Sequence, residues 1–277
     1  MRDGVASKEV PAVLLHGFTG SKRTWGSTVL DGLAEAGIQA YPIDLPGHGA
    51  RRHEVAPSEH ELEAVMASIG EAVDGVGRGQ APDATPPALV GYSMGGRLAL
   101  HFAVRHPHRV SALVLESASP GLARDAERVR RRMDDEALAQ ALESEGIERF
   151  VEHWASLPLF ASRRRLPQTV RNSLRAAQLA NEPRALAASL RGLGTGGLPS
   201  LWDRLPETPV PTLVVVGSLD DKFMEIGRRM VDLLPHARLA VIRNCGHTVH
   251  LEDPSAWTEV VGGFLARHAL ERRGPQG

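Results

Sequence analysis

A nine-residue stretch, LVGYSMGGR at positions 89–97, constrains the fold more than any other part of the chain. An apolar run at 88–90 leads into the pentapeptide Gly-Tyr-Ser-Met-Gly, and a helix-forming segment follows at 97–104. A strand, a tight turn and a helix in this order hold a serine on a strained turn, where flanking glycines avoid the clash of a Cβ. Ser93 would then stand above a sheet, with the Met94 amide and a helix N-terminus facing the same space. The stretch therefore predicts a nucleophile elbow.

Strand-like and helix-like segments alternate on both sides of this elbow. Short apolar runs typical of buried parallel strands lie at 10–15, 38–43, 110–115, 212–217 and 238–242. Helical spacing occurs at 25–36, 59–73, 223–234 and 255–270, and a Gly/Pro-rich connection at 75–87. This alternation indicates right-handed βαβ units, and so an α/β protein with a mostly parallel central sheet and helices on both faces.

The alternation stops after Glu116. From about position 124 to 192 we find no convincing strand pattern, and helical segments rich in Arg, Ala, Leu and Glu are separated by Gly and Pro. We interpret residues 119–205 as an all-helical cap over the C-terminal edge of the sheet. The core would then consist of residues 1–118 and 206–277.

An elbow serine needs a base, and the base needs an acid that orients it. In sheets of this type the chain order is Ser, then Asp or Glu, then His. Asp220 and His247 each lie just beyond the end of an apolar strand. Because active sites of open α/β sheets collect at that edge, we predict a catalytic triad of Ser93, Asp220 and His247. Asp221 is the alternative acid.

A developing oxyanion needs backbone donors as well as the serine. The tripeptide His16-Gly17-Phe18 follows the first apolar strand and would offer the Phe18 amide. Met94, the residue after the serine, would supply the second amide. We therefore predict that Phe18 and Met94 form the oxyanion hole, although Gly17 is also explained as an ordinary turn residue.

Arg97 lies one helical turn after Ser93, on the side of the elbow helix that faces the site. A buried guanidinium is costly unless an anion meets it, and that anion is either a neighbouring carboxylate or a substrate. The cap adds an arginine run, in which Arg128 and either Arg131 or Arg132 share one helix face. A serine triad with two or more arginines suits a small-molecule substrate that carries several carboxylates.

The composition argues against several other classes of protein. The 277 residues carry a net charge of −1, so no overall field favours nucleic acid or an anionic membrane. Cys245 is the only cysteine, which excludes an internal disulfide and fits a reducing compartment. The polar N-terminus and the lack of a long apolar run favour a soluble, cytoplasmic protein. We expect a monomer or small homo-oligomer.

No motif indicates a metal or a cofactor. The chain has no His-Glu-x-x-His sequence, no paired cysteines and no glycine-rich phosphate loop. His48 lies between two glycines and is best explained by loop geometry, and Cys245 by packing of its thiol. We therefore expect no bound metal, nucleotide or other cofactor.

Six strings carry a more specific signal: LHGFTGS, DLPGHG, GYSMGGRLAL, ESASPGL, GSLDDKF and GH-x-x-HLEDP. Together they resemble one family with the α/β-hydrolase fold, the 2-succinyl-6-hydroxy-2,4-cyclohexadiene-1-carboxylate synthases of menaquinone biosynthesis. The resemblance extends nearly from end to end, including the cap.

The resemblance implies a lyase rather than a hydrolase. Members of that family remove pyruvate from 2-succinyl-5-enolpyruvyl-6-hydroxy-3-cyclohexene-1-carboxylate, with the histidine-primed serine as base and the oxyanion hole holding an enolate. By position, Arg97 and Arg131 match arginines that grip substrate carboxylates, and Tyr92 and Trp154 match pocket residues. Arg128 is a weaker match.

Two other functions remain open at this stage. The triad alone supports a serine esterase or thioesterase for small carboxylated substrates equally well. A receptor with the hydrolase fold would keep the architecture without turnover, although a complete triad argues against it. Arg97 separates the lyase from a general esterase, which has no need of a cation at that position.

Overall fold

The computed structural model describes residues 9–77 and 85–273. Most of the Gly/Pro-rich connection predicted at 75–87 therefore lies outside the described residues.

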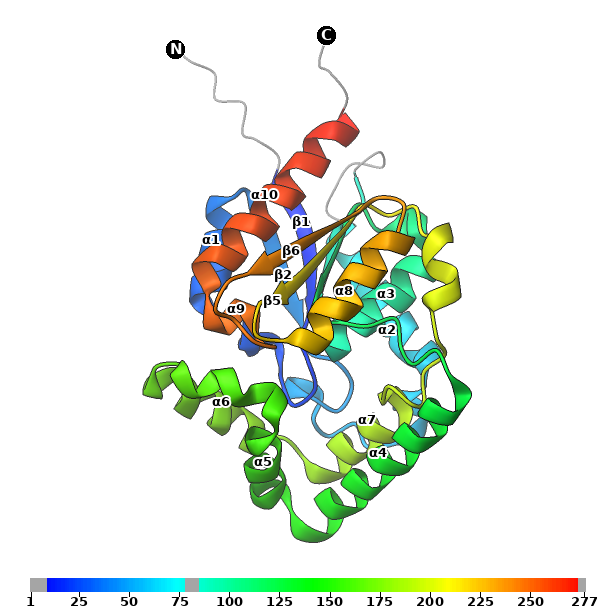
Figure 1. Ribbon diagram of the computed structural model, residues 1–277, viewed down its shortest axis with the longest axis vertical. Helices are drawn as coiled ribbons and strands as arrows, with labels where there is room; N and C mark the ends of the chain where they lie inside the picture. Colours follow the sequence, from blue (N-terminus) through cyan, green and yellow to red (C-terminus); the bar gives the residue numbers. More distant parts are fainter. Residues whose placement is uncertain (1–8, 78–84, 274–277) are drawn as a thin grey trace.

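The described part of the chain is built around a sheet of six parallel strands in the order β2-β1-β3-β4-β5-β6 (Figure 1). The strands are β1 Val10–Leu15, β2 Ile38–Ile43, β3 Ala88–Tyr92, β4 Leu113–Glu116, β5 Thr212–Gly217 and β6 Ala237–Ile242. Every residue of the three central strands β3, β4 and β5 is buried. Such strands are expected where helices cover both faces of a parallel sheet.

Helices cover both faces of this sheet (Figure 1). They are α1 Gly26–Glu35, α2 Leu62–Gly77, α3 Met94–Arg105, α8 Asp221–Leu233, α9 Val249–Glu252 and α10 Pro254–Arg273. Short 3-10 turns are η1 Lys22–Trp25, η2 Gly49–Arg51, η3 Pro57–His60 and η4 Pro107–Arg109. Apolar residues of α2, α3 and α8 form one core cluster with the sheet, and those of α1 and α10 form a second cluster on the opposite face.

The direction of the strand order changes between β1 and β3, and this sets where a site can form. Leu15 at the end of β1 pairs with Gly91 of β3, so the loops that follow these two strands emerge side by side. A crevice beyond the carboxyl ends of the strands is expected at such a switch point. The His16–Phe18 loop and the Ser93 turn both open into it.

The cap comes from the chain between β4 and β5 and lies beyond the carboxyl ends of the strands (Figure 1). Its elements are α4 Asp125–Glu145, α5 Ile147–Ser156, η5 Pro158–Arg165, α6 Gln168–Leu179 and α7 Pro183–Leu193, followed by η6 Trp202–Glu207. Apolar residues of α4, α5 and α7 form a separate small core. All four helices lie within the predicted cap segment 119–205, whose boundaries as a domain remain a proposal.

Several element boundaries differ from the sequence-based expectation, and two elements begin three residues later than expected. The helix expected at 59–73 begins only at Leu62, because Pro57–His60 forms a 3-10 turn that ends at Glu61 in an extended conformation. The strand expected from position 110 begins at Leu113. No helix among residues 9–77 and 85–273 is long and apolar enough to span a membrane.

Candidate active site

Ser93 lies on a sharp turn between β3 and α3, with φ 51° and ψ −109°, a conformation rarely adopted by residues other than glycine. Two glycines make this turn possible. A Cβ on Gly91 would lie 2.5 Å from the carbonyl oxygen of Gly95, and one on Gly95 would lie 2.2 Å from that of Leu15. The Ser93 amide donates to the carbonyl of Glu116, at 2.8 Å, which ties the turn to β4.

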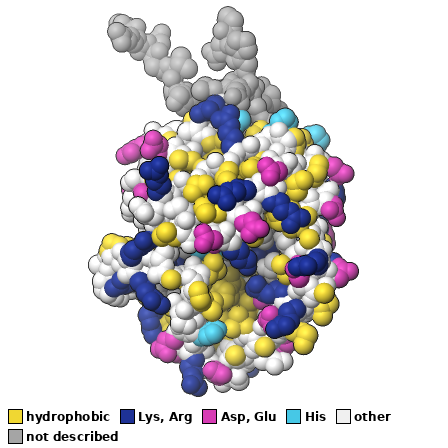
Figure 2. All heavy atoms as spheres, viewed as in Figure 1, with side chains coloured by type: hydrophobic (Ala, Val, Ile, Leu, Met, Phe, Trp, Pro, Cys, Tyr) yellow, Lys and Arg dark blue, Asp and Glu magenta, His cyan; other side chains and the backbone are white. Residues whose placement is uncertain are grey.

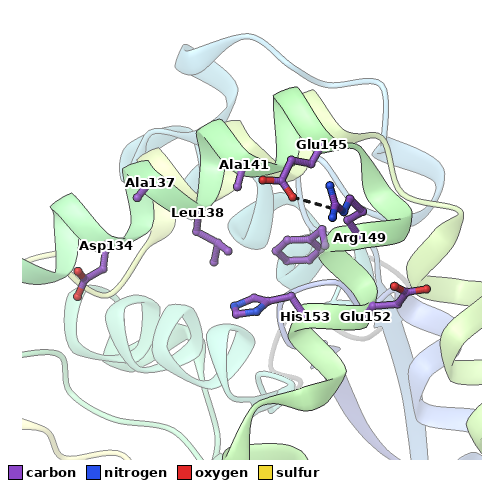
Figure 3. Close-up of a pocket in the computed structure, with 9 residues that line it drawn as sticks. Asp134, Ala137, Leu138, Ala141, Glu145, Arg149, Glu152 and His153 are labelled. Carbon is purple, nitrogen blue, oxygen red and sulfur yellow. Dashed lines mark ion pairs between the residues drawn. The ribbon is translucent and has the colours of Figure 1, made fainter.

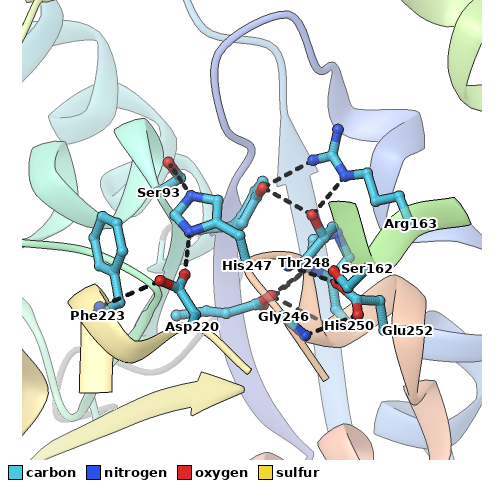
Figure 4. A network of polar contacts seen from close by, with 12 residues as sticks. Ser93, Ser162, Arg163, Asp220, Phe223, Gly246, His247, Thr248, His250 and Glu252 are labelled. Atoms are coloured by element: carbon cyan, nitrogen blue, oxygen red, sulfur yellow. Dashed lines mark hydrogen bonds and ion pairs between the residues drawn. The ribbon is translucent and has the colours of Figure 1, made fainter. Parts of the chain in front are cut away.

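The structure brings Ser93, His247 and Asp220 into one hydrogen-bonded line (Figure 4). His247 Nδ1 donates to Asp220 Oδ2 at 2.7 Å, and His247 Nε2 lies 3.1 Å from Ser93 Oγ. Because the carboxylate fixes the proton on Nδ1, Nε2 is the nitrogen that can accept the serine proton. This is the arrangement in which a serine is activated.

The charge state of His247 is set by its surroundings. Burial lowers the pKa of His247 below its ordinary value of 6.5, and the hydrogen bond to Asp220 opposes that shift. The ring is therefore neutral at pH 7. Asp220 is buried and also caps α8 through the Phe223 amide at 3.3 Å, whereas Asp221 is exposed on the first turn of that helix.

The predicted oxyanion donors lie next to the serine. Phe18 and Met94 both line the cavity that contains Ser93. Within the described chain, neither backbone amide has an intramolecular hydrogen-bond partner. The Phe18 loop is held by His16, whose Nδ1 donates to the Gly17 carbonyl at 2.8 Å and whose Nε2 accepts from the Leu45 amide at 3.1 Å. These two amides are thus free to donate to a ligand.

A cavity of about 180 Å³ lies between the strand ends and the cap. Figure 2 shows that the cap side of the molecule is hollowed on this face, with a largely hydrophobic floor and Lys and Arg side chains around the hollow. The predicted site residues that line the cavity are Phe18, Ser93, Met94, Arg97, Arg131, Trp154 and His247. Apolar and aromatic walls with a few convergent polar groups are typical of a small-molecule site.

Arg97 is partly buried and forms no ion pair within 4 Å in the described chain; its Nη2 donates to the carbonyl of Leu193 at 2.9 Å. Its Nε is buried without a hydrogen-bond partner. Burial, and secondarily the charge of Arg131, lowers the pKa of Arg97 to about 10, while the nearby Asp135 opposes that shift, so the side chain remains a cation at neutral pH. A partly buried and incompletely hydrogen-bonded guanidinium in the cavity of the serine fits an anionic ligand better than a structural ion pair.

Arg131 reaches the same cavity from α4 of the cap. Its Nε donates to Asp135 Oδ1 at 2.8 Å, while the side chain keeps 40% of its surface exposed. Asp135 Oδ2 is buried without a partner, and burial raises the pKa of Asp135. Asp135 thus orients Arg131 and leaves most of its guanidinium free for a second anion.

Two residues that the resemblance placed in the pocket lie elsewhere. Tyr92 is 5% exposed and does not line the cavity, because side chains alternate along a strand and its ring packs with the α1 and α10 side of the sheet. Arg128 is bonded to the carbonyls of Leu122 and Ala123, at 2.8 Å and 3.0 Å, and pairs with Asp125. The structure therefore does not bring Arg128 to the cavity.

Sequence reasoning missed Arg163, which lies on η5 of the cap. Its guanidinium donates to Thr248 and to Tyr92, and lies 3.8 Å from the centre of the Phe160 ring (Figure 4). The only signal was the arginine run at 163–165, and nothing in the sequence distinguished its first member from the other two.

A second cavity, of about 530 Å³, lies in the cap between α4 and α5 (Figure 3). Leu138 points into it and Phe150 also lines it, and Glu145 and Arg149 form an ion pair at its edge at 3.8 Å. It contains no residue of the Ser-His-Asp line. Its Phe150 stacks on Trp154, at 5.6 Å between ring centres, and this aromatic pair separates the two cavities.

The remaining polar candidates have structural explanations. His48 is fully buried and its Nδ1 donates to the Pro46 carbonyl at 2.8 Å, which fits the predicted loop role. Cys245 is buried, and burial raises the pKa of its thiol to about 12, so it is a poor nucleophile. Among the residues described, no cluster of three or more His, Cys, Asp or Glu side chains could hold a metal ion.

The parallel sheet, the elbow after β3 and the Ser-His-Asp line define a class of protein. A model of the alpha/beta hydrolase family matches residues 12–260, which include all three of these side chains. The chain belongs to the alpha/beta hydrolase family.

Relatives place the chain more narrowly. A protein of Bacillus subtilis (strain 168), provisionally named 2-succinyl-6-hydroxy-2,4-cyclohexadiene-1-carboxylate synthase, is 40% identical over 91% of this chain and 89% of its own length. The protein of that name from Enterobacter sp. (strain 638) is 31% identical over 88% of this chain and 87% of its own. The solved structure of MenH from S. aureus is 35% identical with a TM-score of 0.86, covering 95% of this chain and 96% of that one. Within the hydrolase family, the chain thus belongs with the 2-succinyl-6-hydroxy-2,4-cyclohexadiene-1-carboxylate synthases.

Proposed function

We propose that this protein is a carbon–oxygen lyase that eliminates pyruvate from 2-succinyl-5-enolpyruvyl-6-hydroxy-3-cyclohexene-1-carboxylate. The product is 2-succinyl-6-hydroxy-2,4-cyclohexadiene-1-carboxylate. The observation that carries the proposal is the Arg97 cation, with its Nε buried and unpartnered, in the same cavity as an aligned Ser-His-Asp line. The relatives named for this activity support it independently.

In this mechanism Ser93 acts as a base rather than as a covalent nucleophile. His247 Nε2 accepts the hydroxyl proton, and Ser93 Oγ takes the acidic proton from the ring carbon beside the succinyl ketone. The electrons of that carbon–hydrogen bond pass through the enolate of the ketone into a new double bond between ring carbons 2 and 3. The existing ring double bond shifts from carbons 3 and 4 to carbons 4 and 5, and the bond from carbon 5 to the enolpyruvyl oxygen breaks. The departing enolpyruvate takes at carbon the proton left on His247 and leaves as pyruvate.

The Phe18 and Met94 amides would stabilise the negative charge that develops on the ketone oxygen. Free amides aimed at a developing oxyanion contribute typically about 3 kcal/mol each to transition-state stabilisation. Asp220 would hold the His247 tautomer and stabilise the ring when it carries the second proton.

The substrate carries carboxylates that need fixed cationic partners. Arg97 at the floor of the cavity and Arg131 at its cap side would take two of them, since both line the space that Ser93 faces. Trp154 and Phe160 provide aromatic walls for the ring between these charges. Such two-ended anchoring would orient the reacting carbon toward Ser93 Oγ.

The test is to supply the enolpyruvyl substrate and follow pyruvate release, with Ser93→Ala as the matched variant. We expect turnover that Ser93→Ala abolishes. Rapid cleavage of simple carboxylated esters without pyruvate release would replace the lyase by the esterase alternative. Inactivity toward both substrates would favour the third alternative, a receptor with the hydrolase fold that binds its ligand without turnover.

A further inference from the structure

The cap segment η5 is bonded to the loop that carries His247. Ser162 Oγ donates to Glu252 Oε1 at 2.9 Å, and Arg165 Nη2 donates to the carbonyl of Asn244 at 2.6 Å. The Glu252 carboxylate is 4% exposed and also accepts from the amides of Gly246, at 2.8 Å, and Thr248, at 3.2 Å. The cap is therefore bonded to the residues on both sides of His247 (Figure 4).

Arg163 is the centre of this attachment. Its Nε donates to Thr248 Oγ1 at 2.8 Å, and its Nη2 lies 3.0 Å from the hydroxyl of Tyr92. Those two hydroxyls are themselves 3.1 Å apart, so the guanidinium closes a triangle of hydrogen bonds. The two contacts use different nitrogens of one rigid planar group, which an ammonium on a flexible stem cannot reproduce.

Each contact of Arg163 leads directly to His247. Thr248 is its neighbour in the chain. Tyr92 lies 5.6 Å from the imidazole between ring centres, and Phe160, under the Arg163 guanidinium, lies 5.8 Å from it at 69°. Arg163 itself does not line the cavity, in contrast to Arg97 and Arg131.

We propose that Arg163 is a positioning residue, which fixes the orientation of the His247 imidazole from the cap side by holding Thr248, Tyr92 and Phe160 together. Asp220 holds the same ring from the core side through Nδ1. The imidazole is thus fixed between two independent supports, one from each part of the molecule. The kcat measurement described below rests on the proposed lyase function. The proposal that Arg163 fixes the position of the His247 imidazole does not.

The charge of Arg163 has a second, measurable effect on His247. Among the charged groups around the imidazole, Asp220 and Glu116 raise its pKa, and Arg163 lowers it. Lys222 lines the same cavity from α8. Removing the Arg163 cation should therefore raise the pKa of His247, whereas replacing it by lysine should not.

The experiment compares Arg163→Met, Arg163→Lys and Arg164→Met. Arg164 is the matched control, because it is the next residue of η5 and is exposed. For Arg163→Met we expect kcat of pyruvate release to fall roughly 10-fold with KM changed less than about 2-fold, since positioning rather than binding is lost. Arg163→Lys should lose kcat but keep the pKa of His247, and Arg164→Met should match the wild type in both.

The pKa of His247 is measured without substrate, by NMR titration of its ring protons with His247→Gln to assign the signal. This readout stands even if the reaction is not the one proposed. An unchanged pKa in Arg163→Met together with wild-type kcat would overturn the inference. If Arg163→Met does not fold, Arg163→Lys decides, and wild-type kcat in that variant would overturn it equally.

Discussion

Arg97, in the core helix that follows the elbow, is hydrogen-bonded to the backbone of Leu193, the last residue of cap helix α7. This hydrogen bond holds the partly buried cation without neutralising it, because a peptide carbonyl carries no net charge. The guanidinium remains available to a substrate carboxylate.

Replacing Arg97 by alanine should therefore reduce the binding of substrate. We expect KM to rise and kcat/KM to fall by at least about 100-fold, on the order of 3 kcal/mol, through loss of charge-assisted hydrogen bonds. Arg130→Ala removes the same charge from an exposed position on α4 and should have little effect. Steady-state kinetics of pyruvate release checks both, and an unchanged kcat/KM in Arg97→Ala would remove Arg97 from the site.

The two adjacent acids after β5 should differ sharply. Asp220→Asn removes the carboxylate that fixes the His247 tautomer, and we expect kcat to fall roughly 10³–10⁴-fold, as for other serine triads. Asp221→Asn changes an exposed residue and should leave kcat within about 2-fold of the wild type, the range of most surface changes. A larger loss in Asp221→Asn than in Asp220→Asn would reverse the assignment of the acid.

The acid side of the activity profile should report His247. Because burial lowers the pKa of His247 below 6.5, the ring stays neutral and competent down to pH 6.5. We expect kcat/KM to be level from pH 7 to 8 and to decline only below pH 6.5, as the imidazole gains its second proton. A decline that begins above pH 7 in the kcat/KM profile would contradict a lowered pKa.

Buried histidines should make the fold sensitive to acid. Burial lowers the pKa of His16 to about 4 and of His48 and His101 to about 3, all from 6.5. A depressed folded-state pKa contributes stability that is complete above pH 6.5 and is lost as the pH falls toward the folded value. Each such histidine should lower the free energy of unfolding by about 1.4 kcal/mol per pH unit within that window.

Urea titrations between pH 7 and 4 measure this loss. His101→Leu should make the dependence on pH shallower, whereas His53→Ala, at an exposed position, should leave it unchanged. An identical slope in His101→Leu and wild type would mean that His101 is already protonated in the folded protein.

Two glycines in helices should respond oppositely to alanine. A Cβ at Gly95 would lie 2.2 Å from the Leu15 carbonyl oxygen, so Gly95→Ala should disrupt the elbow and destabilise the fold by several kcal/mol. Gly75 in α2 is exposed with nothing within 4 Å of an added Cβ, and Gly75→Ala should stabilise by about 0.5–1 kcal/mol. Thermal unfolding distinguishes the two, and equal effects would contradict the crowding at Gly95.

The residues that were predictable from sequence are those fixed by local geometry. The fold follows from the alternation of elements and the family from the six resembling strings, and both are confirmed by the comparisons. Arg97 could be placed beside Ser93 because both lie within one turn of a single helix. Asp220 and His247 could be placed because each follows a strand of a parallel sheet, and such strands end at one edge.

The residues that were missed depend on how the cap packs against the core. Arg163 reaches Thr248 only through the docking of a 3-10 segment onto a loop 85 residues away in the sequence. Arg128 could not be placed from the sequence for the same reason. Its side chain turns away from the cavity because it donates to the carbonyls of the loop before α4. No periodicity in the sequence encodes either contact.

The strands that flank the cap are hydrogen-bonded neighbours, with Leu113 of β4 paired to Thr212 of β5. Because these strands are parallel, the chain leaves the sheet at the carboxyl end of β4 and re-enters it at the amino end of β5, after η6 Trp202–Glu207. An insertion between two neighbouring strands can change in length or charge without moving either strand. The sheet that carries the triad and the cap that contacts the substrate can consequently diverge at different rates. Exchanging the cap segment 119–205 between relatives should transfer substrate selectivity while leaving Ser93, Asp220 and His247 in place.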